Sequence, residues 1–201
     1  MQLYFSTTSP YARVARIALA EKGLGDFEGR LTDPWTDDPG LLAANPSARV
    51  PTLLPDHGPP LTESLLILLW LETQHPAPSL LGPEPARAIA RTGVAMGGID
   101  AAAAIIISRR IDPAFDESPV GLRRRRSVIG ALERLEADPP SLTEAAADIG
   151  VITAVVLADY IRFRFAGAPW LPRMPALEAL AAQARERASF SSTVPREMPK
   201  A

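Results

Sequence analysis

Strand-like and helix-like segments alternate along the first 75 residues of this chain, and that order constrains the fold more than any other feature. Apolar residues recur at helical spacing through residues 10–22, which Gly23 follows, and a second helix is predicted over residues 63–72. The predicted strands cover residues 2–5, 27–31, 50–54 and 60–62. This order predicts an α/β domain around one small mixed sheet, over residues 1–75. The second helix is apolar all round, so we expect it to be buried on both sides.

The rest of the chain contains helical patterns only. A proline-rich linker at residues 76–84 comes first, and proline or glycine separates the segments that follow. The predicted helices cover residues 86–110, 119–136, 148–165 and 175–187. Four successive helices without strand patterns predict an all-α bundle domain over residues 85–201.

The composition excludes several classes of chemistry. The chain contains no cysteine, so it offers no disulfide, no thiolate metal site and no thiol nucleophile of its own. Both histidines, His57 and His75, lie in turn-like settings, and we expect no metal site. A net charge of −2 gives no whole-chain attraction to nucleic acid. The four arginines at residues 123–126 fan around a helix instead of lining a groove, so we expect no nucleic-acid partner.

Two apolar stretches are too short to span a membrane. Residues 65–71 form the first, and residues 93–107, interrupted by Asp100, form the second, whereas a membrane-spanning helix needs roughly 20 residues. Residues 1–5 read as a strand and lack the basic region of a signal peptide. We therefore expect no membrane partner and a cytoplasmic location.

Ser9 stands where the first predicted strand gives way to the first helix, and two interpretations of it are open. As the N-cap, with Pro10 at the first helical position, its hydroxyl would accept a backbone N–H and stabilise the helix. Alternatively, the hydroxyl and the free N–H groups of the turn would face the thiolate of a ligand. A helix N-terminus carries about half a positive charge, which would lower the pKa of such a thiol.

Two later segments could bind the backbone and the charged end of a small peptide. Pro51 holds Val50 extended, so that the Val50 N–H and C=O could pair with a ligand in strand fashion, although an ordinary proline at a strand start is the alternative. Ser64 and the first N–H groups of its helix could hold a carboxylate, with Glu63 on an ammonium group. The alternative is that Thr62 or Glu63 simply caps the helix. A γ-glutamyl group carries both of the charges that this pair could bind.

Several motifs resemble those of the bacterial glutathione S-transferase superfamily, and the resemblance covers essentially the whole chain. The motifs are Tyr4-Phe5-Ser6-Thr7-Thr8-Ser9-Pro10-Tyr11-Ala12-Arg13, Asn45-Pro46-Ser47-Ala48-Arg49-Val50-Pro51, Thr62-Glu63-Ser64 and Asp148-Ile149-Gly150-Val151-Ile152-Thr153-Ala154. Within the family, Ser-Pro-Tyr at the active-site turn and Asp33-Pro34-Trp35 resemble one subgroup. The resemblance implies a thioredoxin-like α/β domain followed by an all-α helical domain, and a cis bond before Pro51.

The resemblance also implies a function. Ser9 would stabilise the thiolate of glutathione, the co-substrate, for attack on a small apolar electrophile, in a cytosolic homodimer. The implied glutathione-binding residues are Arg49, Val50, Pro51, Glu63 and Ser64. The implied second-substrate residues, in a pocket between the domains, are Tyr11, Met96, Asp100 and Ala104. Two alternatives stay open: a specialised glutathione-dependent etherase, dehalogenase or isomerase, and a non-catalytic module that binds glutathione or another protein.

The chain departs from related sequences at three positions. Ser9 stands where a cysteine would serve glutathione-dependent disulfide reduction, which argues against that reaction. Met96 stands where an acid is common, which predicts a more apolar pocket. Asp148 can cap its helix, but Val151 lacks the carboxylate that would complete a capping box.

Overall fold

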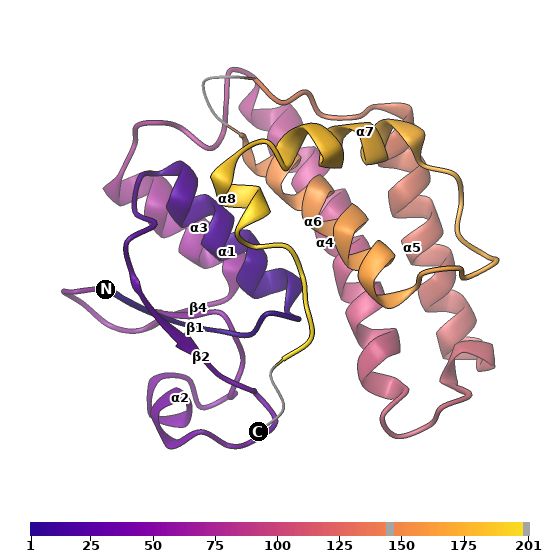
Figure 1. The fold of residues 1–201 in the computed structure, drawn as a ribbon, viewed down its shortest axis with the longest axis horizontal. Coiled ribbons are helices and arrows are strands. Elements are labelled where there is room, and N and C mark those ends of the chain that lie inside the picture. The colour runs from indigo at the N-terminus through magenta and orange to yellow at the C-terminus, as the bar shows by residue number, and fades with distance from the viewer. Residues whose placement is uncertain (144–146, 199–201) are drawn as a thin grey trace. The chain divides into compact units, whose positions relative to one another are not determined.

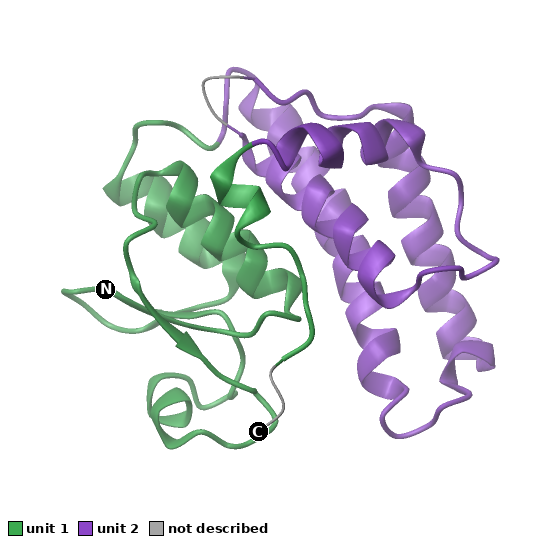
Figure 2. Ribbon diagram, in the orientation of Figure 1, with its two compact units in different colours: residues 1–80, 187–201 green, residues 81–186 purple. Residues whose placement is uncertain are grey.

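The computed structural model describes residues 1–143 and 147–198, and it divides the chain into two compact units. Unit 1 comprises Met1–Leu80 and Arg187–Ala201, and unit 2 comprises Leu81–Glu186 (Figure 2). The division places residues 187–198 with unit 1, whereas the sequence pattern predicted one helical domain over residues 85–201. Contacts between this C-terminal segment and the first helix account for the difference.

Unit 1 contains a four-stranded mixed sheet, as predicted. Its strands are β1 (Gln2–Phe5), β2 (Glu28–Leu31), β3 (Thr52–Leu54) and β4 (Leu61–Thr62), in the order β2-β1-β3-β4. β1 pairs in parallel with β2 and antiparallel with β3, and β3 pairs antiparallel with β4. The helices of this unit are α1 (Pro10–Glu21), α2 (Pro39–Ala44), α3 (Ser64–Gln74) and α8 (Ala188–Ser191). α1 and α3 pack side by side over one face of the sheet (Figure 1). This arrangement is the thioredoxin-like α/β fold.

Local chemistry sets both ends of α1. Ser9 has extended backbone and accepts the Ala12 N–H, and Pro10 begins the helix. Gly23, with a φ of 72°, ends it, because a left-handed residue breaks the helical repeat and glycine adopts that conformation without strain. The face of α1 that includes Val14 and Ile17 is fully buried, as its apolar periodicity predicted.

The expectation that α3 is buried on both sides is wrong for a single chain. Ile67 and Leu71 are fully buried, but Leu65, Leu66 and Leu69 are 41%, 57% and 61% exposed. The sheet and α1 cover one face of the helix only. An apolar helix of this kind therefore presents a leucine surface that another molecule could cover.

The described residues of unit 2 form a bundle of four α-helices, which the sequence predicted to within a few residues. They are α4 (Pro85–Ser108), α5 (Pro119–Ala137), α6 (Ile149–Arg164) and α7 (Pro175–Ala184), with a short 3₁₀ turn, η1 (Phe115–Glu117), before α5. Residues 149–161 of α6 are all buried, so this helix forms the core of the bundle. Asp148 caps α6 by accepting the Val151 N–H at 2.9 Å. The expected cap is therefore present without the reciprocal carboxylate.

α4 is the one helix among the described residues that is long and apolar enough, by length and composition alone, to cross a membrane. Half of its apolar segment is buried inside the fold, where it packs on α5 and α6. Gly98 permits that approach, because a Cβ there would lie 2.9 Å from Ala131 Cβ and Leu157 Cδ2. We therefore interpret α4 as a core helix of the bundle.

The arginine run of α5 belongs to the bundle surface, as predicted. Arg125 pairs with Asp116 and Glu117 and lies over the Trp170 ring, whereas Arg123, Arg124 and Arg126 are exposed. The buried positions of the helix are Val128, Ala131, Leu132 and Leu135. The four arginines therefore point in different directions around the axis.

Candidate functional site

The sheet register brings three predicted segments to one end of the strands. β1 and β3 run antiparallel, as do β3 and β4, in which Thr52 faces Thr62. The carboxyl ends of β1 and β4 therefore lie at the same end of the sheet as the amino end of β3. Ser9 follows β1, Val50 precedes β3 and Glu63 follows β4. Residues that are distant in sequence thus converge at one end of unit 1.

The Ser9 hydroxyl serves as the N-cap and still has a proton to donate. Its oxygen accepts the Ala12 N–H at 3.1 Å, and the residue is half-buried. A hydroxyl has one donor proton in addition to its acceptor lone pairs. The two sequence interpretations of Ser9 are therefore compatible, because the oxygen can cap α1 while the proton points to a ligand.

A hydrogen-bonded turn presents the backbone of Val50. The Val50–Pro51 bond is cis, as the resemblance implied. Asn45 donates from Nδ2 to the Arg49 carbonyl and to Thr52 Oγ1, both at 3.1 Å, and Thr52 donates to the same carbonyl at 2.8 Å. Within the described residues, the Val50 N–H and C=O make no hydrogen bond to the protein. The turn therefore leaves a backbone donor and acceptor available to a ligand.

The start of α3 is an uncapped helix N-terminus. Glu63 occupies the N-cap position with a φ of 64° and makes no side-chain cap hydrogen bond. Ser64 is 3% exposed, and its hydroxyl makes no hydrogen bond to another described residue. A non-glycine residue at positive φ costs free energy and is retained mainly at functional sites. The alternative that Glu63 caps the helix is therefore wrong, and the first N–H groups remain available to an anion.

Arg49 lies beside Glu63 at the surface. The two side chains are 76% and 61% exposed, and Arg49 Nη1 lies 3.8 Å from Glu63 Oε1. An exposed pair of this length contributes about 0–1 kcal/mol to stability, so either side chain can turn to a ligand at little cost.

The predicted second-substrate residues belong to two units. Tyr11 is a half-buried residue of α1 in unit 1. Met96, Asp100 and Ala104 lie four residues apart along α4 in unit 2 and thus share one helix face. Met96 is 9% exposed, Ala104 is half-buried and Asp100 is exposed. A pocket formed by residues of both units therefore stays a prediction.

Positive charge surrounds the amino-terminal half of α1. Burial, together with repulsion from Arg196 and Arg13, lowers the pKa of Arg16 to about 10. Arg16 stays protonated at neutral pH and lies over the Phe5 ring, 4.5 Å from its centroid. These charges add to the positive end of the α1 dipole, and both favour an anion near the turn that carries Ser9.

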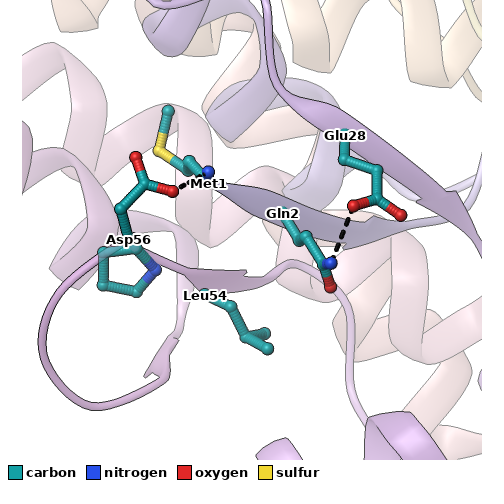
Figure 3. Close-up of a pocket in the computed structure, with 6 residues that line it drawn as sticks. Met1, Gln2, Glu28, Leu54 and Asp56 are labelled. Atoms are coloured by element: carbon teal, nitrogen blue, oxygen red, sulfur yellow. Dashed lines mark hydrogen bonds and ion pairs between the residues drawn. The ribbon is translucent and has the colours of Figure 1, made fainter.

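A cavity of about 480 Å³ lies at the opposite end of β1 (Figure 3). The Met1 amino group pairs with Asp56 there, and Gln2 donates to Glu28 at 2.7 Å. Asp56 and the start of β1 are remote from Ser9, which follows the carboxyl end of that strand. The cavity is therefore distinct from the predicted site. No cluster of three or more metal-ligating side chains occurs among residues 1–143 and 147–198.

Sequence reasoning missed the residues that hold the site in place. Asn45 appeared only as a letter of a motif, although it is 5% exposed and fixes the turn before Val50. Its neighbour Pro46 was a signal for such a turn, because an asparagine side chain often bonds to backbone two residues on, here to the Ser47 N–H at 3.0 Å. Thr7 was missed as well, because its partners lie at the other end of the chain.

Comparisons with known proteins agree with this geometry. Residues 3–79 match the family described as glutathione S-transferase, N-terminal domain. A solved glutathione S-transferase from Methylobacterium radiotolerans, in complex with glutathione sulfonate, is 33% identical, with a TM-score of 0.88 over 100% of this chain and 97% of that one. A second, from Methylobacillus flagellatus with glutathione bound, is 26% identical, with a TM-score of 0.84 over 97% and 99% of the two chains. The GST-like protein YibF of Escherichia coli is 29% identical over 97% of this chain and 98% of its own.

Proposed function

Because the chain belongs to the glutathione S-transferase superfamily, we propose that it binds glutathione at the end of its sheet where Ser9 follows β1. There it would activate the thiol for attack on a small apolar electrophile. One observation carries this proposal: Ser9, Val50 and Ser64 converge at the same end of the sheet in unit 1. Each of the three offers a group that the described protein residues leave available, as a ligand with a thiol, a peptide backbone and a charged end requires.

The binding residues would divide the ligand between them. The Val50 N–H and C=O would pair with the cysteinyl unit, and Pro51 would hold that edge extended. Ser64 and the α3 N-terminus would hold the γ-glutamyl carboxylate, and Glu63 the ammonium group. Arg49 would turn from Glu63 to the glycine carboxylate. Each assignment matches one charge or dipole of the protein to its opposite on the peptide.

Ser9 would act by lowering the pKa of the glutathione thiol. Its hydroxyl would donate to the sulfur, and a hydrogen bond to an ionised group contributes about 1.5–3 kcal/mol. Since one pKa unit corresponds to about 1.36 kcal/mol, a thiol with a pKa near 8.5 would ionise at about pH 7. The thiol proton would leave to solvent. The sulfur lone pair would then form the bond to the electrophile, which either accepts the electrons by addition or loses a leaving group with its bonding pair.

We propose Tyr11, Met96, Asp100 and Ala104 as contacts of the electrophile. Met96 and Ala104 are apolar, which favours an apolar second substrate. We also propose a cytoplasmic homodimer in which the exposed leucines of α3 are covered, because two-fold dimers are the commonest assemblies and the exposed leucine surface needs a partner.

The test is a pH titration of the ultraviolet absorbance of bound glutathione thiolate. Wild type is expected to show a thiol pKa about 1–2 units below that of free glutathione, and Ser9→Ala is expected to lose most of that shift. Ser47→Ala is the matched control, because Ser47 lies beside the site but contributes only its backbone N–H to the turn. Equal shifts in wild type and Ser9→Ala, without loss of conjugating activity, would contradict the proposed role of Ser9 and leave it as the cap of α1 only.

A further inference from the structure

The C-terminal segment, residues 187–198, lies along α1 and runs antiparallel to it (Figure 1). Its first attachment is at the carboxyl end of the helix. Arg187 donates to both carboxylate oxygens of Glu21, at 3.1 and 2.6 Å, and Ser189 donates to the same carboxylate. Phe190, the residue after Ser189, is fully buried. The start of the segment is therefore firmly anchored to unit 1.

The second attachment, along the middle of α1, consists of two long hydrogen bonds. Arg13 Nε donates to Thr193 Oγ1 at 3.4 Å, and Arg16 Nη2 donates to the Ser192 carbonyl at 3.4 Å. Thr193 is 5% exposed. Residues three apart on a helix face the same side, so α1 turns one arginine-bearing face to the segment.

The third attachment reaches the active-site turn itself. The Arg196 N–H donates to the Thr7 carbonyl at 3.2 Å, and the Thr7 hydroxyl donates to Met198 Sδ at 3.4 Å. Thr7 is 7% exposed and precedes Ser9 by two residues. The segment therefore bonds both the backbone and the side chain of a buried residue inside the turn that carries the proposed catalytic hydroxyl.

Among the described residues, the hydrogen bonds between residues 6 and 9 are long. The Ser9 N–H reaches the Ser6 carbonyl at 3.4 Å, beyond the usual range for such a bond, and the Ser6 and Thr8 hydroxyls lie 3.1 Å apart. A hydrogen bond weakens steeply as its distance and angle depart from the ideal. Ser9 is held on its helical side, where Oγ accepts the Ala12 N–H at 3.1 Å, so the remaining freedom of the turn lies in the residues before Ser9.

We propose that residues 195–198 position the active-site turn. The Arg196 N–H and the Met198 sulfur hold Thr7, so that Ser9 directs its hydroxyl at the glutathione sulfur. This inference rests on the function proposed above. Arg196 and Met198 act through Thr7 and Ser9, so they are positioning residues. Val50 and Ser64 lie elsewhere in unit 1, and neither makes a hydrogen bond or ion pair with the described residues 187–198. Loss of residues 195–198 should therefore change the pKa of the bound glutathione thiol much more than the affinity for glutathione.

Two matched pairs of variants test this inference. Arg196→Pro removes the N–H that Thr7 accepts, whereas Arg196→Ala keeps the N–H and removes the guanidinium. A chain that ends at Val194 removes the whole third attachment, whereas a chain that ends at Met198 keeps it. All four retain the Glu21–Arg187 anchor and the buried Phe190, so we expect each variant to fold, which circular dichroism checks.

The readouts are the pKa of bound glutathione thiol, from its ultraviolet absorbance, and the dissociation constant of glutathione. Arg196→Pro and the chain ending at Val194 should raise the thiol pKa by about 0.5–1 unit, with an unchanged dissociation constant to within about threefold. The chain ending at Met198 should match wild type. Arg196→Ala loses one positive charge near α1 and should raise the thiol pKa by clearly less than Arg196→Pro does. Equal thiol pKa values in all four variants would overturn the inference, and so would equal shifts in Arg196→Pro and Arg196→Ala. Failure of wild type to bind glutathione would overturn the proposed function first, and this inference with it.

Discussion

Replacement of Asn45 by alanine should lower the free energy of unfolding and weaken the binding of glutathione. The Asn45 side chain makes three hydrogen bonds: Nδ2 donates to the Arg49 carbonyl and to Thr52 Oγ1, each at 3.1 Å, and Oδ1 accepts the Ser47 N–H at 3.0 Å. At 5% exposure, it is closed to water. These bonds fix the turn from which Val50 presents its backbone.

The expected cost follows from what each partner loses. Three hydrogen bonds at about 1 kcal/mol each give an upper figure of about 3 kcal/mol. Ser47 is exposed, so water can replace one bond, and Thr52 still donates to the Arg49 carbonyl at 2.8 Å. We therefore expect a loss of about 2 kcal/mol in the free energy of unfolding, which lowers Tm by about 4–8 °C in a protein of this size. A loosened Val50 must be ordered again on binding, at about 1–2 kcal/mol per residue, so the glutathione dissociation constant should rise about tenfold.

Thermal unfolding and isothermal titration of glutathione together test this expectation for Asn45→Ala. A control variant of similar stability loss in unit 2, Asp116→Asn, separates local from global effects and should leave the glutathione dissociation constant unchanged. If Asn45→Ala lost less than about 0.5 kcal/mol, or bound glutathione as wild type does, the reasoning about the turn would be refuted.

Three further predictions concern packing, charge and assembly. Gly121→Ala should destabilise by about 2 kcal/mol in thermal unfolding, because its Cβ would lie 2.0 Å from a backbone carbonyl oxygen, whereas Gly130→Ala in the same helix has open space and should stabilise by about 0.5–1 kcal/mol. Hydrogen bonds from Arg109 hold the pKa of Asp116 below its usual value, so the stability it contributes is present above about pH 4 and is lost as pH falls through the folded-state pKa. The gap in unfolding free energy between wild type and Asp116→Asn should therefore be constant near neutral pH and close in acid, and a gap that widens in acid would contradict this. Leu66 is 57% exposed, so Leu66→Glu should leave the fold intact and convert the dimer to a monomer in analytical ultracentrifugation; a monomeric wild type would reject the proposed assembly.

The order of the elements in this fold was predictable because it rests on local chemistry. Ser9 and Pro10 mark the start of α1 and Gly23 marks its end, and each acts within a few residues of itself. The three segments of the proposed site could likewise be recognised from short motifs, since a proline after Val50 and a polar pair at the start of α3 constrain the backbone where they stand.

The exposure of α3 and the course of the C-terminal segment could not be predicted. An all-apolar helix has the same sequence pattern whether its own chain or another molecule covers it, so Leu66 and Leu69 read as core residues. The pair of Arg187 with Glu21 joins residues 166 positions apart, and single charged residues in a sequence carry no information about such a partner. The division of the chain at residue 187 follows from contacts of this kind.

The central claim is that the N-terminus of α3 in unit 1 binds glutathione. It is tested by isothermal titration of glutathione into wild type, Ser64→Ala and the control Ser47→Ala. We predict saturable binding to wild type and to Ser47→Ala. Ser64→Ala should bind about 10- to 150-fold more weakly, because a hydrogen bond to a carboxylate contributes about 1.5–3 kcal/mol. Absence of heat and of thermal stabilisation in wild type at about millimolar glutathione, or identical binding by all three proteins, would contradict the account.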